Sequence, residues 1–382
     1  MNIAILIKYD FDPTAGGVQR VTDNLSTIFY NAGHTIIIIC FTDIEQDYLH
    51  SPIPVFTVNS ETDLKNLIRK QKITVVINQE GYSRKFTKLV LNSRRPDTYV
   101  INNLHINPLN FYDNYRQFIG LFLKNHKLSL LNNILVHKTI LGYHIVKQRY
   151  DLNYIIKHTN AFVMLSERFK PELFFLAPSL KKFEKKIHGI GNPFTLPDID
   201  ITLLNKENII LFVGRLNILQ KRVDLLMEIW KDLHQKLPEW KFWVVGEGED
   251  QDYMKDFCKK NQLNRVTFFG KDNPNDYYKK AKIFHLTSAF EGFGNVLVEA
   301  QSYGCVPILF NSYSAAQDIV TSTENGILIK PFDVNAYVDE TISLVLNPEK
   351  LSDMGLNGYE NTKIFSYPET YKKWEQVFNS LK

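Results

Sequence analysis

The chain has 382 residues, of which 44% are hydrophobic and 23% are charged, and its formal net charge at pH 7 is +4. This length predicts two or three domains with sizeable cores. The apolar runs are too short to cross a bilayer, which takes about 20 residues. The N-terminus has no basic segment or cleavage-like site, so we expect no secretory signal. Cys40, Cys258 and Cys305 are too widely spaced for a disulfide framework or a metal site, which fits a reducing cytoplasm.

The charge is unevenly distributed along the chain. Residues 1–195 contain 24 Lys and Arg against 15 Asp and Glu, a balance of +9, whereas the remainder is at −5. A basic half indicates an anionic partner, although a merely solvated surface has the same composition. The excess is diffuse and lacks a concentrated patch with stacking aromatics, which disfavours nucleic acid. We therefore expect a cytoplasmic protein with peripheral contact to the anionic inner face of the membrane.

The first half of the chain alternates strands with helices. Residues 2–7 are typical of a buried strand, Gly16 and Gly17 open a helix over residues 18–32, and residues 35–40 form a β-branched run typical of a buried parallel strand. Further strands are expected near 54–58, 73–78 and 98–103, with helices between them. A long helical, aromatic and basic region then extends to residue 150. This order predicts a doubly wound α/β sheet.

Glycine and proline punctuation in residues 190–200 indicates a linker between two domains. A second α/β run follows, with strands at 210–213, 242–245, 266–269, 283–286 and 306–310. We predict an N-terminal Rossmann-like domain over 1–195, a C-terminal Rossmann-like domain over 196–365, and a final helix over 366–382.

The stretch 283–310 carries the most informative pattern. A buried strand leads into a loop with Gly292 and Gly294, and a helix begins near Asn295. Glycine lets backbone approach a ligand closely, and the N-terminus of the following helix offers free N–H groups to an anion. Glu291 precedes the loop, and Glu299 lies on the helix on the order of 7 Å from its start. That position suits a carboxylate that accepts the two hydroxyls of a ribose whose phosphates rest on the helix N-terminus.

Two cations follow the first strand of the second half. Arg215 comes directly after Gly214, and Lys221 lies just before a helix. Open α/β sheets bind ligands at the carboxyl ends of their strands. Arg as a fork and Lys as a point charge could hold a diphosphate there, although either cation alone would be ordinary surface charge.

These residues carry a resemblance to a known family. The string EGFGNVLVEAQSYGCVPI, residues 291–308, resembles the E-x7-E signature of retaining GT-B glycosyltransferases, specifically glycosyltransferase family 4, and GRLNILQK, residues 214–221, resembles that family's diphosphate-binding segment. The resemblance implies that Gly16 and Gly17 form the first glycine-rich turn and that His105 lies near the donor sugar. It places donor contacts at Gly292, Phe293, Gly294, Asn295 and Val296 and nucleotide-base contacts at Gly270 and Lys271.

The resemblance also implies a fold and a reaction. Two Rossmann-like doubly wound domains would face across a cleft, the first binding the acceptor and the second a UDP- or GDP-linked sugar, with the final helix crossing back to the first domain. A sugar would pass to a glycan or lipid-linked acceptor with retention of configuration, in cell-surface polysaccharide synthesis. Attack on the front face needs no protein nucleophile, and Glu291 would bind hydroxyls of the donor sugar.

No metal and no other cofactor is expected to take part. The strings at residues 198–200 and 250–252 have the Asp-x-Asp form of a metal motif, but the first lies in the linker and the second opens a helix, where acids are common. Arg215, Lys221 and the helix N-terminus supply the positive charge that a metal would bring.

Three alternatives stay open. A non-hydrolysing nucleotide-sugar 2-epimerase would use the same fold and donor without an acceptor. A non-catalytic nucleotide-sugar-binding protein would need no intact set of charged residues. A dehydrogenase is disfavoured because GEGEDQ, residues 246–251, lacks the third glycine of a dinucleotide fingerprint.

Overall fold

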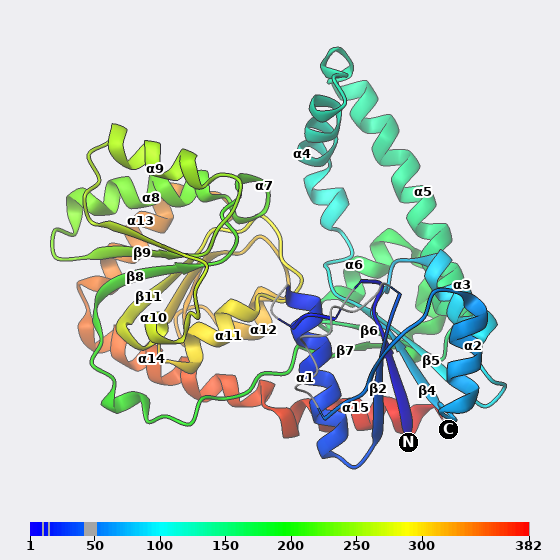
Figure 1. The fold of residues 1–382 in the computed structure, drawn as a ribbon. Coiled ribbons are helices and arrows are strands. Elements are labelled where there is room, and N and C mark those ends of the chain that lie inside the picture. The colour runs from blue at the N-terminus through cyan, green and yellow to red at the C-terminus, as the bar shows by residue number, and fades with distance from the viewer. Residues whose placement is uncertain (10, 14–15, 42–51, 382) are drawn as a thin grey trace. The chain divides into compact units, whose positions relative to one another are not determined.

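The protein forms two α/β units in a computed structural model that describes residues 1–9, 11–13, 16–41 and 52–381 (Figure 1). Unit 1 comprises Met1–Pro193 and Tyr367–Lys382, and unit 2 comprises Phe194–Ser366. The chain passes from unit 1 to unit 2 after Pro193 and returns to unit 1 after Ser366. Among the described residues, no helix is both long and apolar enough to cross a membrane.

Unit 1 is built on a parallel sheet of seven strands in the order β3-β2-β1-β4-β5-β6-β7. Their bounds are β1 (Asn2–Leu6), β2 (Thr35–Cys40), β3 (Val55–Thr57), β4 (Val75–Asn78), β5 (Tyr99–Leu104), β6 (Ala161–Met164) and β7 (Ile187–Gly189). β1 pairs with β2 on one side and with β4 on the other, so it is central. A central strand is covered on both faces, which explains why residues 3–6 of β1 are all apolar and buried.

Helices cover both faces of this sheet. They are α1 (Gly17–Asn31), α2 (Glu61–Lys70), α3 (Arg84–Ser93), α4 (Asn110–Asn125), α5 (Ile134–His158), α6 (Phe169–Leu176) and α15 (Tyr367–Ser380). Alternate residues of β1 point to opposite faces. Ile3 and Ile5 join the core under α1 and α15, whereas Ala4 and Leu6 join the core under α2 and α3.

The final helix completes the core of unit 1. Trp374 and Phe378 of α15 are buried, and both rings pack edge-on against Phe29 of α1, with centroid distances of 5.4 and 5.3 Å. The chain therefore returns to unit 1 after it has built unit 2.

The region after β5 differs from the single long helical segment that the sequence indicates. It consists of two helices, α4 and α5, joined by residues 126–133, and α5 extends to His158. Asn133 caps α5 because its side chain accepts hydrogen bonds from the backbone N–H groups of Leu135 and Val136. The two helices form a hairpin that projects from unit 1 (Figure 1).

Unit 2 repeats the strand order of unit 1 with six parallel strands, β10-β9-β8-β11-β12-β13. Their bounds are β8 (Glu207–Val213), β9 (Lys241–Val245), β10 (Val266–Gly270), β11 (Ala281–Leu286), β12 (Val306–Phe310) and β13 (Ile327–Ile329). The helices are α7 (Ile218–Lys221), α8 (Val223–Lys236), α9 (Gln251–Lys260), α10 (Asn275–Lys280), α11 (Asn295–Ser302), α12 (Ala316–Ile319), α13 (Val334–Val345) and α14 (Pro348–Thr362). The core contains Trp230, Phe242 and Tyr337.

Each sheet reverses its strand order at one point. The reversal lies between β1 and β4 in unit 1 and between β8 and β11 in unit 2. Loops that leave the two strands at such a point diverge to opposite faces, and the crevice at their carboxyl ends is where open α/β sheets bind ligands. The predicted doubly wound fold is confirmed, and it directs attention to the loops after β1, β4, β8 and β11.

Candidate active site

The loop after β8 holds Lys221 in a buried position. Asn217 caps the short helix α7 by accepting hydrogen bonds from the backbone N–H groups of Gln220 and Lys221, at 3.2 and 3.0 Å. A Cβ on Gly214 would lie 3.2 Å from Cε of Lys221, so glycine at that position leaves room for the lysine stem. The loop thus directs a cation inward at the carboxyl end of the sheet.

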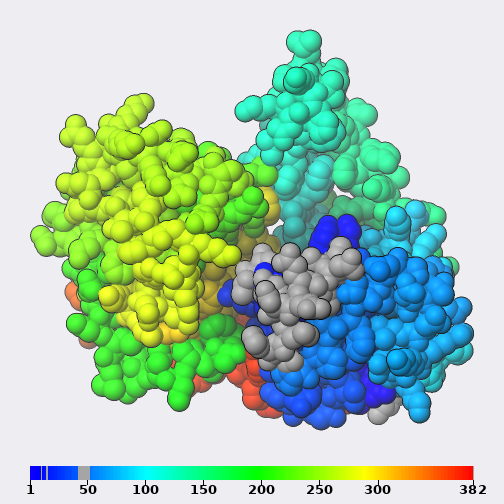
Figure 2. Space-filling model, viewed as in Figure 1, coloured from blue at the N-terminus to red at the C-terminus, as the bar shows by residue number. Residues whose placement is uncertain are grey.

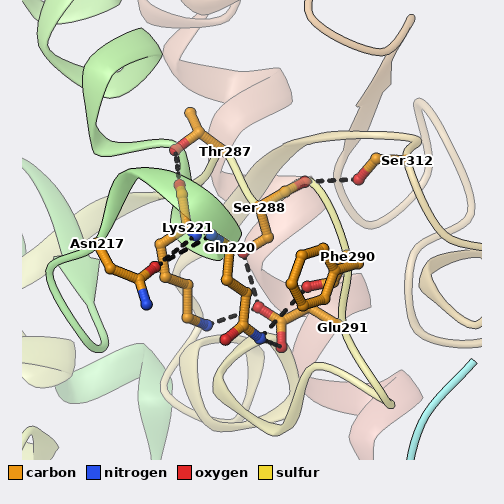
Figure 3. A network of polar contacts seen from close by, with 8 residues as sticks. All are labelled: Asn217, Gln220, Lys221, Thr287, Ser288, Phe290, Glu291 and Ser312. Atoms are coloured by element: carbon orange, nitrogen blue, oxygen red, sulfur yellow. Dashed lines mark hydrogen bonds and ion pairs between the residues drawn. The ribbon is translucent and has the colours of Figure 1, made fainter. Parts of the chain in front are cut away.

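Lys221 forms a buried ion pair with Glu291. Its Nζ lies 2.6 Å from Glu291 Oε1, and the two side chains are only 10% and 11% exposed. Ser288 Oγ donates to the same carboxylate oxygen at 2.7 Å, and Gln220 Nε2 donates to the other oxygen at 3.3 Å (Figure 3). An ionised carboxylate needs several donors when it is removed from water, and these three groups supply them.

Hydrogen bonds join the loops that carry this pair. Thr287 Oγ1 donates to the Lys221 carbonyl at 2.7 Å, and Ser312 Oγ donates to the Ser288 carbonyl at 2.6 Å (Figure 3). The backbone N–H of Ala289 donates to the Gln220 carbonyl at 2.7 Å. The carboxyl ends of β8, β11 and β12 therefore form one connected polar network.

The glycine loop leads directly into α11. Gly294 is the N-cap, with φ +93° and no side-chain capping bond, so the first N–H groups of the helix receive nothing from a cap side chain. A Cβ on Gly294 would lie 2.5 Å from the Tyr313 hydroxyl. Glycine is thus required here both by the left-handed backbone and by the neighbouring tyrosine.

Tyr313, in the loop after β12, adjoins the glycine loop, and the sequence did not indicate it. Its ring is buried, and its hydroxyl has no hydrogen-bond partner among the residues that the structure describes. Burial raises the pKa of Tyr313 well above its usual 10, and the charge of Glu291 adds to that effect. The hydroxyl is therefore a neutral donor beside the Glu291 carboxylate and Gly294.

Glu299 lies on α11, where it is 8% exposed. It accepts a hydrogen bond from the Tyr278 hydroxyl at 3.1 Å. The other residues predicted to contact the donor lie in the same loop and at the start of α11, between Glu291 and Glu299. They are Gly292, Phe293, Asn295 and Val296. Glu291 and the glycine loop thus follow the carboxyl end of β11, and Glu299 lies on α11 in contact with Tyr278 of α10.

Arg215 lies apart from the Lys221–Glu291 pair. Its side chain is 69% exposed, and its Nε lies 3.2 Å from Glu249 Oε2. The loop that carries Glu249 packs closely on the loop after β8, because any Cβ on Gly246 or Gly248 would clash with the backbone carbonyls of Gly214 or Leu216. Glycine at these two positions therefore allows the two loops to pack against each other.

The loop after β10 adjoins the same region. Gly270 has φ +74°, and its carbonyl accepts a hydrogen bond from the Gly246 N–H at 2.7 Å. Glu247 Oε1 accepts from the Lys271 N–H at 3.4 Å. Gly270 and Lys271 are therefore fixed against the loop after β9, at the same edge of the sheet as Gly214.

Unit 1 contains a cavity of about 680 Å³ at its own strand reversal. The lining comes from the loops after β1, β4 and β5 and includes Gly16, Gly17, Glu80, Tyr82 and His105. Apart from the chain neighbours, no atom of the described residues lies within 4 Å of a Cβ built on Gly16 or Gly17, so these glycines leave open space beside the cavity.

His105 is held in one orientation and one charge state. Burial lowers its pKa to about 4, so the ring is neutral at physiological pH. Its Nε2 lies 2.6 Å from Gln79 Oε1, which also accepts from Asn103 Nδ2 at 3.0 Å. Gln79 Nε2 donates to Thr22 Oγ1, which fixes the amide orientation and makes His105 Nε2 the donor. Nδ1 is then a hydrogen-bond acceptor.

Glu80 is a second ionisable group of this cavity, and burial raises its pKa while the charge of Lys8 opposes that shift. Sequence inspection missed Gln79, Glu80, Gln220, Ser288 and Tyr313. One signal could have found three of them: Glu80, Ser288 and Tyr313 lie two or three residues after the ends of β4, β11 and β12.

The sequence is similar to those of known glycosyltransferases. The family model described as Glycosyl transferases group 1 matches residues 198–361, which lie within unit 2. Amylovoran biosynthesis glycosyltransferase AmsD of Erwinia amylovora is 22% identical over 98% of this chain and 99% of its own length. The Campylobacter jejuni alpha-1,4-N-acetyl-D-galactosaminyltransferase named for GalNAc-alpha-(1->4)-GalNAc-alpha-(1->3)-diNAcBac-PP-undecaprenol is 28% identical over 53% of this chain and 57% of its own.

Solved structures show the fold. A crystal structure of an S. aureus TarM mutant, in complex with Fondaparinux, alpha-GlcNAc-glycerol and UDP, has a TM-score of 0.76 at 15% identity and covers 99% of this chain and 100% of that one. The fold is therefore GT-B, with two Rossmann-like α/β units, and its second unit matches a glycosyltransferase family.

Proposed function

We propose that the protein is a retaining glycosyltransferase of family 4 that moves a hexosyl group from a UDP- or GDP-linked donor to a glycan or lipid-linked acceptor in cell-surface polysaccharide synthesis. The observation that carries the proposal is the buried Lys221–Glu291 pair beside the uncapped N-terminus of α11, at the strand reversal of a unit that matches the glycosyltransferase family. Relatives named for amylovoran synthesis and for an undecaprenol-linked glycan support the substrate class.

The donor diphosphate would lie at α11 and Lys221. The helix N-terminus supplies N–H donors and the positive end of a dipole, and Lys221 supplies a full charge. Arg215 would join them by leaving Glu249, and this exchange costs little because an exposed ion pair is worth at most about 1 kcal/mol. Glu299 would accept the ribose hydroxyls, and the loop around Gly270 and Lys271 would contact the base.

The transfer needs positioning more than it needs a protein nucleophile. The bond from the anomeric carbon to the diphosphate oxygen breaks, the acceptor oxygen bonds to the same face of that carbon, and the acceptor proton passes to the departing phosphate oxygen. Lys221 and α11 would stabilise the charge that develops on the diphosphate. Glu291 would orient the sugar through its hydroxyls.

The acceptor would occupy the cavity of unit 1. Neutral His105 can accept a hydrogen bond at Nδ1 from a hydroxyl of the donor sugar, and it brings no charge to that contact. Burial raises the pKa of Glu80, so its carboxylate is a stronger hydrogen-bond acceptor than that of an exposed glutamate and suits the orientation of an acceptor hydroxyl.

Incubation with UDP- and GDP-sugars and polyprenyl-diphosphate-linked glycans tests the proposal. We expect a glycosylated acceptor whose new bond keeps the anomeric configuration of the donor, as read by NMR. Conversion of the donor sugar in the absence of acceptor would instead identify a 2-epimerase. Binding without turnover of any donor would identify a nucleotide-sugar-binding protein.

Replacement of Glu299 tests the ribose contact. Glu299→Ala removes a charged hydrogen-bond partner worth about 1.5–3 kcal/mol, so nucleoside diphosphate affinity should fall at least about tenfold by calorimetry. Tyr278→Phe is the matched control, because it removes the hydroxyl that donates to Glu299 and leaves the carboxylate in place. It should weaken binding much less. Equal affinity of Glu299→Ala and the unmodified protein would disprove the contact.

A further inference from the structure

The α4–α5 hairpin carries a surface that the proposed reaction does not use. α5 has 25 residues, which is about 37 Å at 1.5 Å per residue. Its buried residues near the C-terminal end, Leu152, Ile155 and Ile156, fasten it to unit 1, and nothing between residues 138 and 151 is buried. The far part of the hairpin therefore projects from unit 1, as Figures 1 and 2 show.

The end of the hairpin is apolar. Leu130 is 99% exposed and Leu135 is 75% exposed. We call the following set of exposed side chains the hairpin tip: Leu121, Phe122, Leu128, Leu130, Leu131, Ile134 and Leu135. A cluster of this size within 15 consecutive residues is the type of surface that binds another apolar phase.

The charge around the hairpin tip selects the kind of partner. The sequence has no Asp or Glu from residue 114 to residue 150, and that stretch contains six cations, Arg116, Lys124, Lys127, Lys138, Lys147 and Arg149. All six are exposed: Lys124 and Lys127 lie among the residues of the hairpin tip, and Lys138 follows it on α5. A second copy of the hairpin would bring the same positive charge, whereas an anionic lipid surface complements it.

Aromatic residues complete the pattern. Tyr143 and Tyr150 are 66% and 64% exposed along α5, behind the apolar end. Tyrosine prefers the boundary between apolar chains and headgroups, and lysine reaches headgroups while its stem stays in apolar surroundings. Both tyrosines lie farther from the apolar end than Lys124, Lys127 and Lys138 do, as expected if the apolar end and its lysines enter the bilayer first.

The base of the hairpin opens on the cavity of unit 1. A second cavity of about 320 Å³ is lined by Phe111 of α4 and by His144, Lys147 and Asp151 of α5. Tyr82 and Ile106 line both this cavity and the larger one. Leu135 of the hairpin tip and His144 of the second cavity are separated by a rise of about 14 Å along α5. A sugar that is attached to a lipid in the bilayer could span this distance.

We infer that the hairpin tip inserts into an anionic bilayer as a monotopic anchor and places the cavity of unit 1 beside lipid-linked acceptors. The inference of a membrane contact depends only on the hairpin, whereas the inference that an acceptor is delivered depends also on the proposed function. Partial insertion of an apolar end with flanking lysines gives reversible binding without a membrane-spanning helix.

Vesicle flotation of the full chain tests the anchor. The unmodified protein should bind phosphatidylcholine vesicles that contain phosphatidylglycerol and should bind pure phosphatidylcholine much less. The variant Leu130→Ser with Leu135→Ser should lose at least about tenfold in partitioning. The matched control is Leu203→Ser with Leu346→Ser, which changes leucines that are 80% and 75% exposed in unit 2, and it should bind like the unmodified protein.

A charge series separates the hairpin from the basic character of unit 1. Replacing Lys124, Lys127 and Lys138 by Gln should weaken binding by about a hundredfold, because each cation near an anionic leaflet contributes roughly fivefold. Replacing the exposed Lys181, Lys182 and Lys185 by Gln removes the same charge elsewhere in unit 1 and should have little effect. Binding should also fall at 1 M salt, where the Debye length is roughly 3 Å.

Three results would overturn the inference. The first is that the unmodified protein does not bind vesicles at low salt. The second is that the hairpin and control variants lose vesicle binding equally. The third is that a hairpin variant differs from the unmodified protein only in its oligomeric state. Nucleoside diphosphate binding and transfer to a short water-soluble acceptor are measured on the same variants. These should stay unchanged in the hairpin variants, so a failure of the anchor is distinguishable from a failure of the proposed reaction.

Discussion

Lys221 and Glu291 depend on each other in a way that shapes any mutational test of the site. Loss of one partner from a buried ion pair leaves an uncompensated charge and costs about 3–5 kcal/mol, whereas loss of both is much cheaper. A single substitution therefore lowers both stability and activity, and activity alone cannot assign a role to either residue.

A double substitution separates the two effects. Lys221→Met should lower the free energy of unfolding by about 3 kcal/mol and transfer by at least about a hundredfold. Adding Glu291→Gln should restore most of the stability, because the amide that replaces the carboxylate carries no charge, and should leave transfer low. Urea unfolding and kcat/KM measure the two outcomes. Recovery of transfer in the double variant would contradict a role for Lys221 at the diphosphate.

Tyr313 offers a test in the opposite direction. A buried hydroxyl without a partner costs about 1–3 kcal/mol, so Tyr313→Phe should leave the free energy of unfolding unchanged or raise it by about 1 kcal/mol. The matched control is Tyr337→Phe, since the buried Tyr337 hydroxyl donates to the Ile308 carbonyl and its loss should destabilise the protein. If the Tyr313 hydroxyl contacts the donor, Tyr313→Phe also raises the KM for donor, whereas a loss of stability equal to the control would contradict an unpartnered hydroxyl.

The residues of the site differ in how far the sequence indicated them. Glu291 and Glu299 follow from a string whose glycines and spacing belong to a helix start, and Lys221 follows from its place after a strand. Their contacts did not follow: Lys221 pairs with Glu291, while Arg215 faces Glu249. The position of Tyr313 just after β12 could have been noticed, but its proximity to Gly294 depends on how two loops pack and could not be predicted.

At the scale of elements, β11 places a histidine in the core of unit 2. His285 is 2% exposed, packs edge-on against Tyr337, and lies 3.4 Å from Thr341 Oγ1. Burial lowers its pKa to about 3. The His285 ring is therefore protonated below about pH 6.5 in the unfolded chain, but only below about pH 3 in the folded protein. Stability is fully present above pH 6.5 and declines as the pH falls through that window.

The expected decline is about 2 kcal/mol between pH 6.5 and pH 5 for this one group. Urea unfolding at the two pH values should show it, and His285→Gln should reduce the difference by that amount even if the variant is less stable throughout. Subtracting the pH difference of the variant from that of the unmodified protein cancels the other titrating groups. An identical pH dependence in both proteins would show that His285 does not titrate as described.

Strands were easier to predict than the hairpin, for a physical reason. β1 and β2 are buried on both faces, so their hydrophobic runs are unmistakable. Much of α5 touches neither the sheet nor a second layer, and its apolar residues follow no single face. The break between α4 and α5 depends on the Asn133 cap, a signal of one residue within a long helical region.

At the scale of the whole molecule, the same strand order is used twice. The order 3-2-1-4-5-6 appears in β1–β6 and again in β8–β13, and in both units the polar residues gather where it reverses. The alternation of strands and helices predicted both sheets. It did not predict the cavities, which depend on side chains from loops that are distant in sequence.

The need for a metal ion is tested on the whole protein. We expect full turnover in excess EDTA, because Lys221 and the N-terminus of α11 would neutralise the leaving diphosphate. Asp250, of the second Asp-x-Asp string, already accepts a hydrogen bond from the Ile218 N–H at 2.6 Å, so its carboxylate is used in holding α7. Activity that disappears in EDTA and returns with Mg²⁺ or Mn²⁺ would contradict this expectation.

The return of α15 to unit 1 sets an order for synthesis on the ribosome. Phe29 and its neighbours on α1 stay uncovered until Trp374 has been translated, after all of unit 2. At about 5–20 residues per second, the wait is roughly 20 to 70 seconds. Unit 2 is one continuous segment and can fold during that time, whereas nascent unit 1 exposes an apolar face. A chain cut short within unit 2 would keep that face uncovered, which makes it a substrate for chaperones and proteases before it could act on any acceptor.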